Sequence, residues 1–421
     1  VINNDIINSN TYLDYEVKSI YDITIVATDS YGAQNSNNFS IQLIDVYDNF
    51  AYSGTSTIVI NGVVDNNYPD ILSIPPSINS IPVISIGDNA FKDLSFKQIS
   101  IPETVTHIGS NSFENCENLT SVIFIGDPIN LTTISNFAFR NSSINELIIP
   151  ANSINNSYSI GQRCFSDCTS LTSVIINDSS NLYTLASYSF YGCTNLTSII
   201  IGSGVTYLDN SCFENCTNLT NITIGSTCER IGNLCFRNCS SLSSINFPDS
   251  VTLFGQDMFR GTPNIKTITI PSSMTRLHTE CFYLSGLTSI NIPDNIVHIE
   301  QEAFERCYSL TEVTMTNNVT SIGNEAFSSC SALSILTLSN NITNISSQCF
   351  RSTDLKSIVI PDGVTRISSY AFNYCTILTN IVIPDSVTQI DFAAFQRIGS
   401  AVIICSSYII NTYSSNTSVF S

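Results

Sequence analysis

Cysteine is the residue with the widest chemical repertoire in this 421-residue sequence, which contains fifteen of them. Closely spaced thiol pairs can build a zinc site, which needs four convergent ligands, and three C-x₃-C pairs occur: Cys164/Cys168, Cys212/Cys216 and Cys235/Cys239. The pairs, however, occupy equivalent places in similar segments, just before and three residues after a phenylalanine. We therefore interpret the cysteines as small buried hydrophobic residues. We expect neither zinc nor disulfides, because equivalent side chains in stacked segments run parallel.

Other catalytic residue types are scarce or regularly spaced. Two of the three histidines, His107 and His298, fill a variable position that we predict to face outward. Glu114, Glu214 and Glu305 each follow a phenylalanine directly, which predicts a solvent-facing row of carboxylates and not a catalytic pair. The sequence has no G-x-S-x-G elbow, no P-loop and no G-x-G-x-x-G. We expect no enzymatic activity.

The regular spacing comes from an internal repeat built around one phenylalanine. It recurs every 22 to 26 residues, at Phe91, Phe113, Phe139, Phe165, Phe190, Phe213, Phe236, Phe259, Phe282, Phe304, Phe327, Phe350, Phe372 and Phe395. The shared pattern is V-T-x-I-G-x-x-A-F-x-x-C-x-x-L-T-S-I-x-I-P. A period in the twenties indicates a solenoid, in which each unit buries its apolar side against the next.

Each unit has a readable internal structure. Leu310, Val313 and Met315 show the spacing of a short strand with inward-facing apolar residues, and a proline often ends this strand. V-T-x-I-G is a second short apolar stretch. We predict that A-F-x-x-C forms a single helical or 3₁₀ turn.

This repeat resembles the BspA-like class of leucine-rich repeats, found on surface proteins of bacteria, some protists and some large viruses. The resemblance implies a mainly β fold: a solenoid of about 14 repeats of 22–26 residues with a parallel β-sheet. We assign 87–400 to the repeats, 51–86 to an N-terminal cap and 401–421 to a C-terminal cap, since a solenoid needs atypical ends.

Residues 1–50 lack the repeat and resemble the C-terminal half of a cadherin repeat, a partial β-sandwich. The resemblance rests on Leu13-Asp14-Tyr15-Glu16 and on Asp45-Val46-Tyr47-Asp48-Asn49. It implies a calcium site whose oxygen ligands are Asp14, Glu16, Asp45, Asp48 and Asn49. The alternative is a structural turn of exposed acids. Because half a sandwich is barely stable, we expect the chain to be the C-terminal piece of a longer protein.

The charge balance limits the partners. Fifteen Lys and Arg against 34 Asp and Glu give a formal charge of −19, which disfavours nucleic acid and anionic lipid. The sequence contains no window of 18 consecutive apolar residues, so it predicts no membrane-spanning helix.

The outward positions of the repeat strand predict where a partner binds. One row contains Thr172, Thr197 and Thr220, and another contains Ile123, Ile148, Ile175 and Ile200. An apolar stripe beside short hydroxyls is typical of an interaction site. The alternative is that these residues serve strand propensity alone. We expect binding on the concave sheet of the N-terminal half.

Two functions fit this sequence. One is an adhesion or recognition scaffold, extracellular or displayed on a cell or virion, that binds a protein or glycan on a host or neighbouring surface. The other is a structural spacer or fibre component that self-associates and has no soluble ligand.

Overall fold

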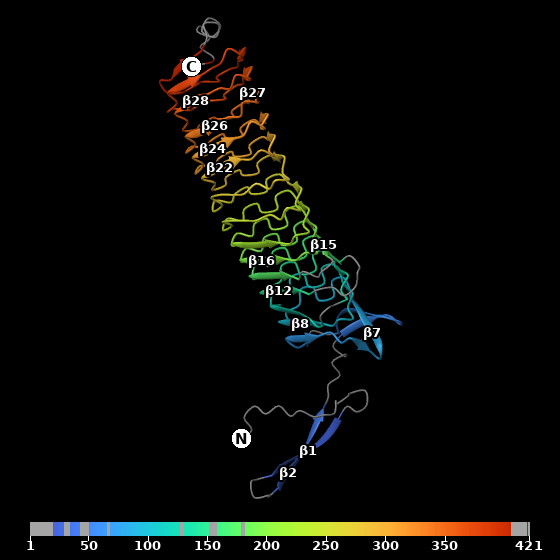
Figure 1. Ribbon diagram of the computed structural model, residues 1–421. Coiled ribbons are helices and arrows are strands. Elements are labelled where there is room, and N and C mark those ends of the chain that lie inside the picture. Colours follow the sequence, from blue (N-terminus) through green and yellow to red (C-terminus); the bar gives the residue numbers. More distant parts are fainter. Residues whose placement is uncertain are drawn as a thin grey trace.

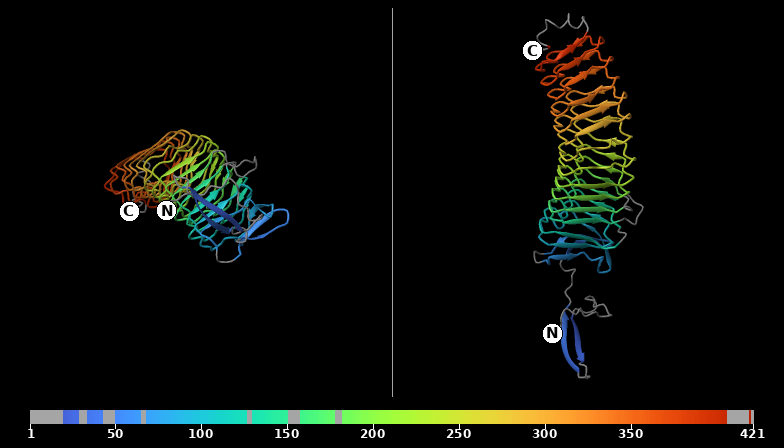
Figure 2. Two further views of the ribbon diagram at one scale, coloured as in Figure 1. Left: turned by 90° about the horizontal axis from the view of Figure 1, so that it is seen from below. Right: turned by 60° about the vertical axis from the view of Figure 1, so that its left-hand side comes forward.

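Most of the chain forms one long coil of short strands and turns, seen along its length in Figure 1 and from two further sides in Figure 2. This computed structural model describes residues 20–28, 34–42, 50–64, 68–126, 130–150, 158–177, 182–405 and Val419. One circuit of the coil, which we call a rung, corresponds to one sequence repeat. Each rung has three sides: a longer strand, a shorter strand and a turn segment. The predicted solenoid of about 14 repeats is confirmed.

The first side, which we call the long-strand sheet, is built from the Leu-x-x-Ile-x-Ile segments. Its strands are β5 (Ile71–Ser73), β8 (Gln98–Ile101), β10 (Ser121–Phe124), β12 (Glu146–Ile149), β14 (Ser173–Ile176), β16 (Ser198–Ile201), β18 (Asn221–Ile224), β22 (Ser289–Ile292), β24 (Glu312–Met315), β26 (Ile335–Thr337), β28 (Ser357–Val359), β30 (Asn380–Val382) and β32 (Val402–Ile404). Hydrogen-bonded neighbours within it pair parallel, in the groups β5-β8-β10, β12 to β18, β22 to β26 and β28 to β32. The alternating burial of β12 and β16 matches the period of two that a half-buried strand requires.

The second side, which we call the short-strand sheet, comes from the V-T-x-I segments. Its strands are β7 (Ile81–Ile86), β9 (His107–Ile108), β11 (Thr133–Ile134), β13 (Tyr158–Ile160), β15 (Leu182–Leu185), β17 (Tyr207–Leu208), β19 (Arg230–Ile231), β20 (Leu253–Phe254), β21 (Arg276–Leu277), β23 (His298–Ile299), β25 (Ser321–Ile322), β27 (Asn344–Ile345), β29 (Arg366–Ile367) and β31 (Gln389–Ile390). These strands also pair parallel, in the groups β7 to β20, β21 to β25 and β27 to β31.

Antiparallel pairs occur only before the first repeat in the described part of the chain. β1 (Ile20–Thr28) pairs with β2 (Gln34–Gln42) as a hairpin. β3 (Phe50–Ser53) pairs with β4 (Ile58–Val63), and β4 joins β7 in parallel, so this hairpin extends the short-strand sheet. β6 (Ser77–Ile78) pairs with β7. Phe50 packs edge-on against Phe91 at 6.2 Å and covers the first ring of the array.

The repeat phenylalanines form a continuous stack in the interior. All fourteen are at most 2% exposed. Successive rings lie 4.7–5.8 Å apart between centroids and are within 20° of parallel. This ring spacing is close to the separation of hydrogen-bonded strands, so the backbone ladder and the ring stack share one repeat distance. The prediction that every repeat Phe is buried is confirmed.

The third side, which we call the turn column, differs from the predicted helical or 3₁₀ turn. In every rung the residues two before and two after the Phe have left-handed backbone, with φ of 53–64° at the non-glycine positions. Their N–H groups and that of the Phe point along the coil axis to three carbonyls of the next rung, at 2.7–3.2 Å. Phe236, for example, donates to the Met258 carbonyl at 3.1 Å.

The predicted helical geometry was wrong because a helix directs all its N–H groups back along its own segment. Here only alternate N–H groups do so, as Arg237 does to the Leu234 carbonyl, and the others bond to the next rung. A left-handed residue costs about 1–2 kcal/mol, and the hydrogen bonds between rungs offset this cost. At the last rung the Phe395 N–H donates to the carbonyl of Val419, whose side chain is buried.

In rungs where V-T-x-I-G ends in glycine, adjacent rungs approach closely at that residue; other rungs carry a side chain there, such as Asp209. A Cβ on Gly161 would lie 2.5 Å from the Asn136 backbone nitrogen of the preceding rung. Asn136 itself accepts a hydrogen bond at Oδ1 from the N–H of Gln162, at 2.8 Å. The glycine thus makes room for an asparagine ladder that joins adjacent rungs at the start of the turn column.

Candidate recognition surface

The predicted isoleucine stripe lies on the outward face of the long-strand sheet. Parallel pairing aligns Ile148 with Ile175 and Ile175 with Ile200, so the three side chains follow one another from rung to rung. Ile148 is 55% exposed and Ile200 is 47% exposed, while Ile175 between them is half-buried. Ile123 is also exposed and belongs to the preceding rung. The structure therefore brings all four predicted isoleucines together.

A hollow of about 340 Å³ opens at the start of this stripe, between β10 and β12. These two strands belong to different hydrogen-bonded groups, so the ladder is interrupted there. The hollow is lined by Ser121, Val122, Ile123, Phe124, Glu146, Ile148 and Pro150. Its apolar walls and single carboxylate fit one apolar side chain with a positive or donor group beside it. No sequence signal marked this hollow.

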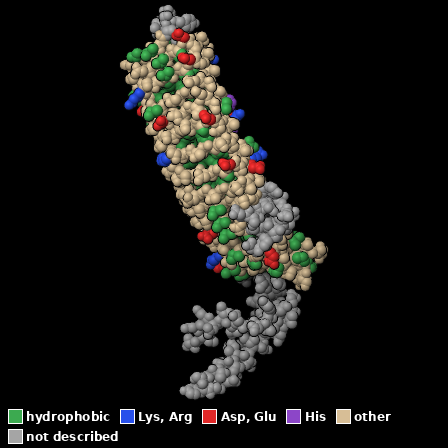
Figure 3. All heavy atoms as spheres, in the orientation of Figure 1, with side chains coloured by type: hydrophobic (Ala, Val, Ile, Leu, Met, Phe, Trp, Pro, Cys, Tyr) green, Lys and Arg blue, Asp and Glu red, His purple; other side chains and the backbone are tan. Residues whose placement is uncertain are grey.

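The predicted threonine row is exposed, but its hydroxyls are engaged. The Oγ1 atoms of Thr172, Thr197 and Thr220 each donate to the backbone carbonyl of the preceding rung, at 3.0, 2.9 and 3.0 Å. These hydroxyls therefore tie the rungs together, and they offer a partner acceptor lone pairs more readily than donors. Figure 3 shows a surface made largely of such uncharged groups, with few and scattered charged side chains.

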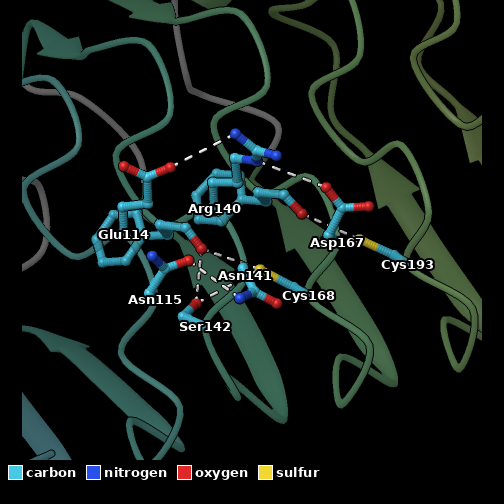
Figure 4. A network of polar contacts seen from close by, with 10 residues as sticks. Glu114, Asn115, Arg140, Asn141, Ser142, Asp167, Cys168 and Cys193 are labelled. Carbon is cyan, nitrogen blue, oxygen red and sulfur yellow. Dashed lines mark hydrogen bonds and ion pairs between the residues drawn. The ribbon is translucent and has the colours of Figure 1, made fainter. Parts of the chain in front are cut away.

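The carboxylates that follow the repeat Phe do not form the predicted solvent-facing row. Glu114, Glu214 and Glu305 are nearly buried. They sit between the two left-handed positions of the turn column. Glu114 and Glu214 pair with basic residues of adjacent rungs, whereas Glu305 pairs with Arg306 of its own rung. Figure 4 shows one such cluster, in which Arg140 bridges Glu114 and Asp167. Lys92 lies 2.8 Å from Glu114 on the opposite side.

This correction has a physical reason: a nearly buried carboxylate must be paired or neutralised. Where pairing is weak, protonation becomes easier. Burial and the neighbouring Glu302 raise the pKa of Glu305 to about 7. The ion pairs of Glu114 and Glu214 join adjacent rungs and so stabilise the stack.

The cysteines are free thiols, and all but Cys405 are buried. Those three residues after the Phe act as hydrogen-bond donors: the Sγ of Cys239 lies 3.1 Å from the Phe213 carbonyl, and Cys168 and Cys193 make the same bond one rung apart. Burial raises the pKa of Cys116 to about 12 and that of Cys168 to about 11, so the thiols stay protonated. Ser142, Thr262 and Thr353 stand at the same position, but their hydroxyls donate to the Phe carbonyl of their own rung.

The repeat architecture matches a known family over most of its length. The family described as BspA type Leucine rich repeat region matches in six copies, over residues 84–181, 158–287 and 275–401. The chain belongs to the BspA-type leucine-rich repeat family. A search of curated proteins found no match to this chain.

The chain is similar to solved leucine-rich repeat structures. A leucine-rich repeat protein from Bacteroides ovatus is 24% identical, with 86% of this chain and 99% of that chain covered and a TM-score of 0.59. A leucine rich cell surface protein from Faecalibacterium prausnitzii is 26% identical, with 91% and 95% covered and a TM-score of 0.48. The first of these likenesses supports the solenoid fold.

The short-strand sheet of the BspA-type array carries the histidines at outward positions, as predicted. His298 Nδ1 lies 2.8 Å from Ser321 Oγ in the next rung, at the edge of an open hollow of about 550 Å³. His107 contacts Ser135 of its next rung in a similar way, at 3.4 Å. These contacts are rung-to-rung side-chain contacts.

The predicted calcium ligands Asp14, Glu16, Asp45, Asp48 and Asn49 lie outside the described residues. Across the described ranges of the BspA-type chain, no three His, Cys, Asp or Glu side chains converge as a metal site. The same ranges include no helix with the length and apolarity to cross a bilayer.

Proposed function

We propose that this BspA-type solenoid is a recognition scaffold, displayed outside a cell or on a virion, that binds a protein or glycan partner. The binding surface is the isoleucine stripe with the hollow at its start. Adjacent Thr172, Thr197 and Thr220 form the polar border. The supporting observation is the exposure of consecutive isoleucines on a sheet whose remaining outward residues are mostly Ser, Thr and Asn.

The expected binding energy comes mainly from burying this stripe. Fully burying an isoleucine contributes about 1.5–3 kcal/mol, so each half-exposed member contributes about 1 kcal/mol on contact. Filling the hollow beside Ile123 and Ile148 adds a well-packed anchor of the kind that dominates many interfaces. The short, hydrogen-bonded hydroxyls around the stripe lose little side-chain entropy.

The test replaces Ile148, Ile175 and Ile200 together with lysine. Binding of the purified chain to a panel of intact cells and to a glycan array is measured before and after the replacement. We expect binding to be abolished while the melting temperature stays nearly unchanged, since these side chains point away from the core.

The matched control is Leu253→Lys, which places the same charge at a 53% exposed apolar residue of the short-strand sheet. It should leave binding intact. Undiminished binding by the triple lysine variant would move the site away from the stripe.

A structural spacer is the second candidate function. The unbroken phenylalanine stack and the uniform hydrogen bonds between rungs favour a stiff rod of fixed length. A spacer has no soluble ligand, so the parent chain would bind neither cells nor glycans in the assay above.

A further inference from the structure

The outward face of the long-strand sheet carries a second apolar patch near its C-terminal end. We call it the C-terminal patch, and it consists of Ile335, Val359, Val382, Val402 and Ile404. Parallel pairing aligns Val359 with Val382 and Val382 with Ile404, in the same row as the isoleucine stripe. Val359 is 66% exposed and Ile404 is 55% exposed.

The two apolar areas lie on the same side of the molecule. The labelled long strands from β8 to β28 follow one flank of the body in Figure 1. Between the stripe and the C-terminal patch, six consecutive rungs present a polar residue in the same row: Thr223, Asn246, Thr269, Asn291, Thr314 and Thr337. The face is thus apolar, polar and apolar along its length.

This pattern is self-complementary when one copy is turned end over end. With Thr269 at the two-fold axis, counting rungs places Ile123 opposite Ile404, Ile148 opposite Val382 and Ile175 opposite Val359. Ile200 then lies opposite the rung of Ile335. A two-fold interface repeats each contact twice, so one antiparallel pair covers both stripes and both patches.

The charges on this face favour the antiparallel direction. Glu146 is exposed beside the stripe, and Lys356 is exposed beside the C-terminal patch. Neither forms an ion pair within the described chain. In the antiparallel arrangement Glu146 of one copy and Lys356 of the other are offset by one rung, which is about 5 Å along the rod axis. In a parallel arrangement each Glu146 would face the other Glu146.

One charge near the axis needs an explanation. Lys266 belongs to the same rung as Thr269, so two copies bring their Lys266 side chains close together. The Lys266 ammonium, however, donates to the carbonyl of Pro263 in its own rung, at 2.8 Å. It is therefore turned toward its own chain, and solvent at this polar centre screens the remaining repulsion.

We propose that one partner of the long-strand sheet is a second copy of this chain, packed face to face and antiparallel about Thr269. The proposal rests on the proposed function, because it names a protein partner for the same face. It makes recognition homophilic, so two surfaces that carry this chain can adhere to each other.

The first experiment measures the monomer–dimer equilibrium of the purified chain by analytical ultracentrifugation. We expect a dimer at micromolar concentration. Glu146→Lys and Lys356→Glu should each weaken it about tenfold or more, and the double variant Glu146→Lys/Lys356→Glu should restore it. Leu253→Lys on the opposite sheet should leave the dimer unchanged.

The second experiment tests the direction of packing with cysteine variants and a bismaleimide of about 10 Å reach, matching the spacing of packed sheets. Ile148→Cys mixed with Val382→Cys should crosslink into a dimer, while Ile148→Cys alone should not. All these variants also carry Cys405→Ser, because Cys405 is not buried and lies beside Ile404 in the C-terminal patch. The buried native thiols stay unlabelled in the folded chain.

Three results would overturn the proposal. The first is a chain that stays monomeric at 100 μM or above, which is about ten times the highest concentration at which we expect the dimer to form. The others are a double charge variant that fails to recover the dimer and crosslinking of Ile148→Cys to itself. A monomeric chain that still binds cells through the stripe would leave the proposed function standing with a different partner. A dimer that binds no cell or glycan would support homophilic recognition alone.

Discussion

Replacing Phe236 with alanine tests the ring stack at the middle of the array. Phe236 is fully buried, and its ring stacks on Phe213 and Phe259 at 5.8 Å on each side. Truncating a core Phe to Ala costs about 3–5 kcal/mol. We expect the upper part of that range, because two stacked neighbours lose their partner and no rung can slide into the gap without breaking its hydrogen bonds.

The consequence for unfolding follows from the one-dimensional architecture. Each rung contacts only its neighbours, so stability is a sum of rung and interface contributions. Damage at Phe236 weakens the interfaces on both of its sides and uncouples the two halves. Thermal unfolding followed by circular dichroism should change from one transition to two. Hydrogen exchange should show the earliest opening around residues 213–259.

The control is Ser244→Ala, an exposed position of the following strand segment, which should cost less than about 0.5 kcal/mol. If Phe236→Ala and Ser244→Ala melted alike, the assignment of the repeat Phe as the structural centre of the rung would be refuted.

Three further predictions concern the thiols, the carboxylates and calcium. Cys239→Ala removes one of the two donors to the Phe213 carbonyl, which keeps the Cys216 N–H, and should cost about 0.5–1.5 kcal/mol. Cys239→Ser should cost less; urea unfolding measures both, and equal losses would contradict the donor role. The pKa of Glu305 lies near 7 in the folded chain, whereas an unfolded glutamate titrates near 4.3. Between these pH values the folded state binds more protons than the unfolded state, so the free energy of unfolding should fall as pH rises from about 4 to 7. Denaturation at several pH values should show a flatter dependence for Glu305→Gln, and an unchanged slope would rule out this carboxyl as the cause. Calorimetry should detect calcium binding by the chain, with Asp14→Asn and Asp48→Asn removing the heat; an absence of heat in the parent chain would favour the structural turn of exposed acids.

The repeat pattern was sufficient to predict the solenoid, the buried Phe stack and the two strands of each rung. These features depend on apolar residues at fixed spacing, which a sequence displays directly. The stripe residues were placed correctly for the same reason, since their row follows from strand alternation. The hollow between β10 and β12 could not be predicted, because it depends on an interruption of hydrogen bonding between two rungs whose strand sequences look ordinary.

The turn column was predicted wrongly because its conformation is imposed by stacking. Leu234, Glu302 and Arg306 adopt left-handed backbone although their residue types favour helix. Only the hydrogen bonds to the next rung explain their conformation. The nearly buried position of Glu114 has the same origin: an acidic residue type suggests exposure, and the Lys92 and Arg140 partners come from neighbouring rungs about 22–26 residues away in sequence.

The uniform direction of the hydrogen bonds in the turn column gives the rod an electrical polarity. In a β-ladder the peptide groups alternate in direction, and their dipoles nearly cancel. In the turn column all the N–H groups that link rungs point toward the C-terminal end, from Phe91 to Phe395. Their dipoles therefore add, as they do in an α-helix, but over a length set by the number of repeats. The sense is opposite to that of a helix: the end near Phe91 carries partial negative charge, and the end near Phe395 carries partial positive charge. When two rods lie side by side and antiparallel, the negative end of each lies beside the positive end of the other. The backbone dipoles therefore favour the antiparallel orientation of neighbouring molecules.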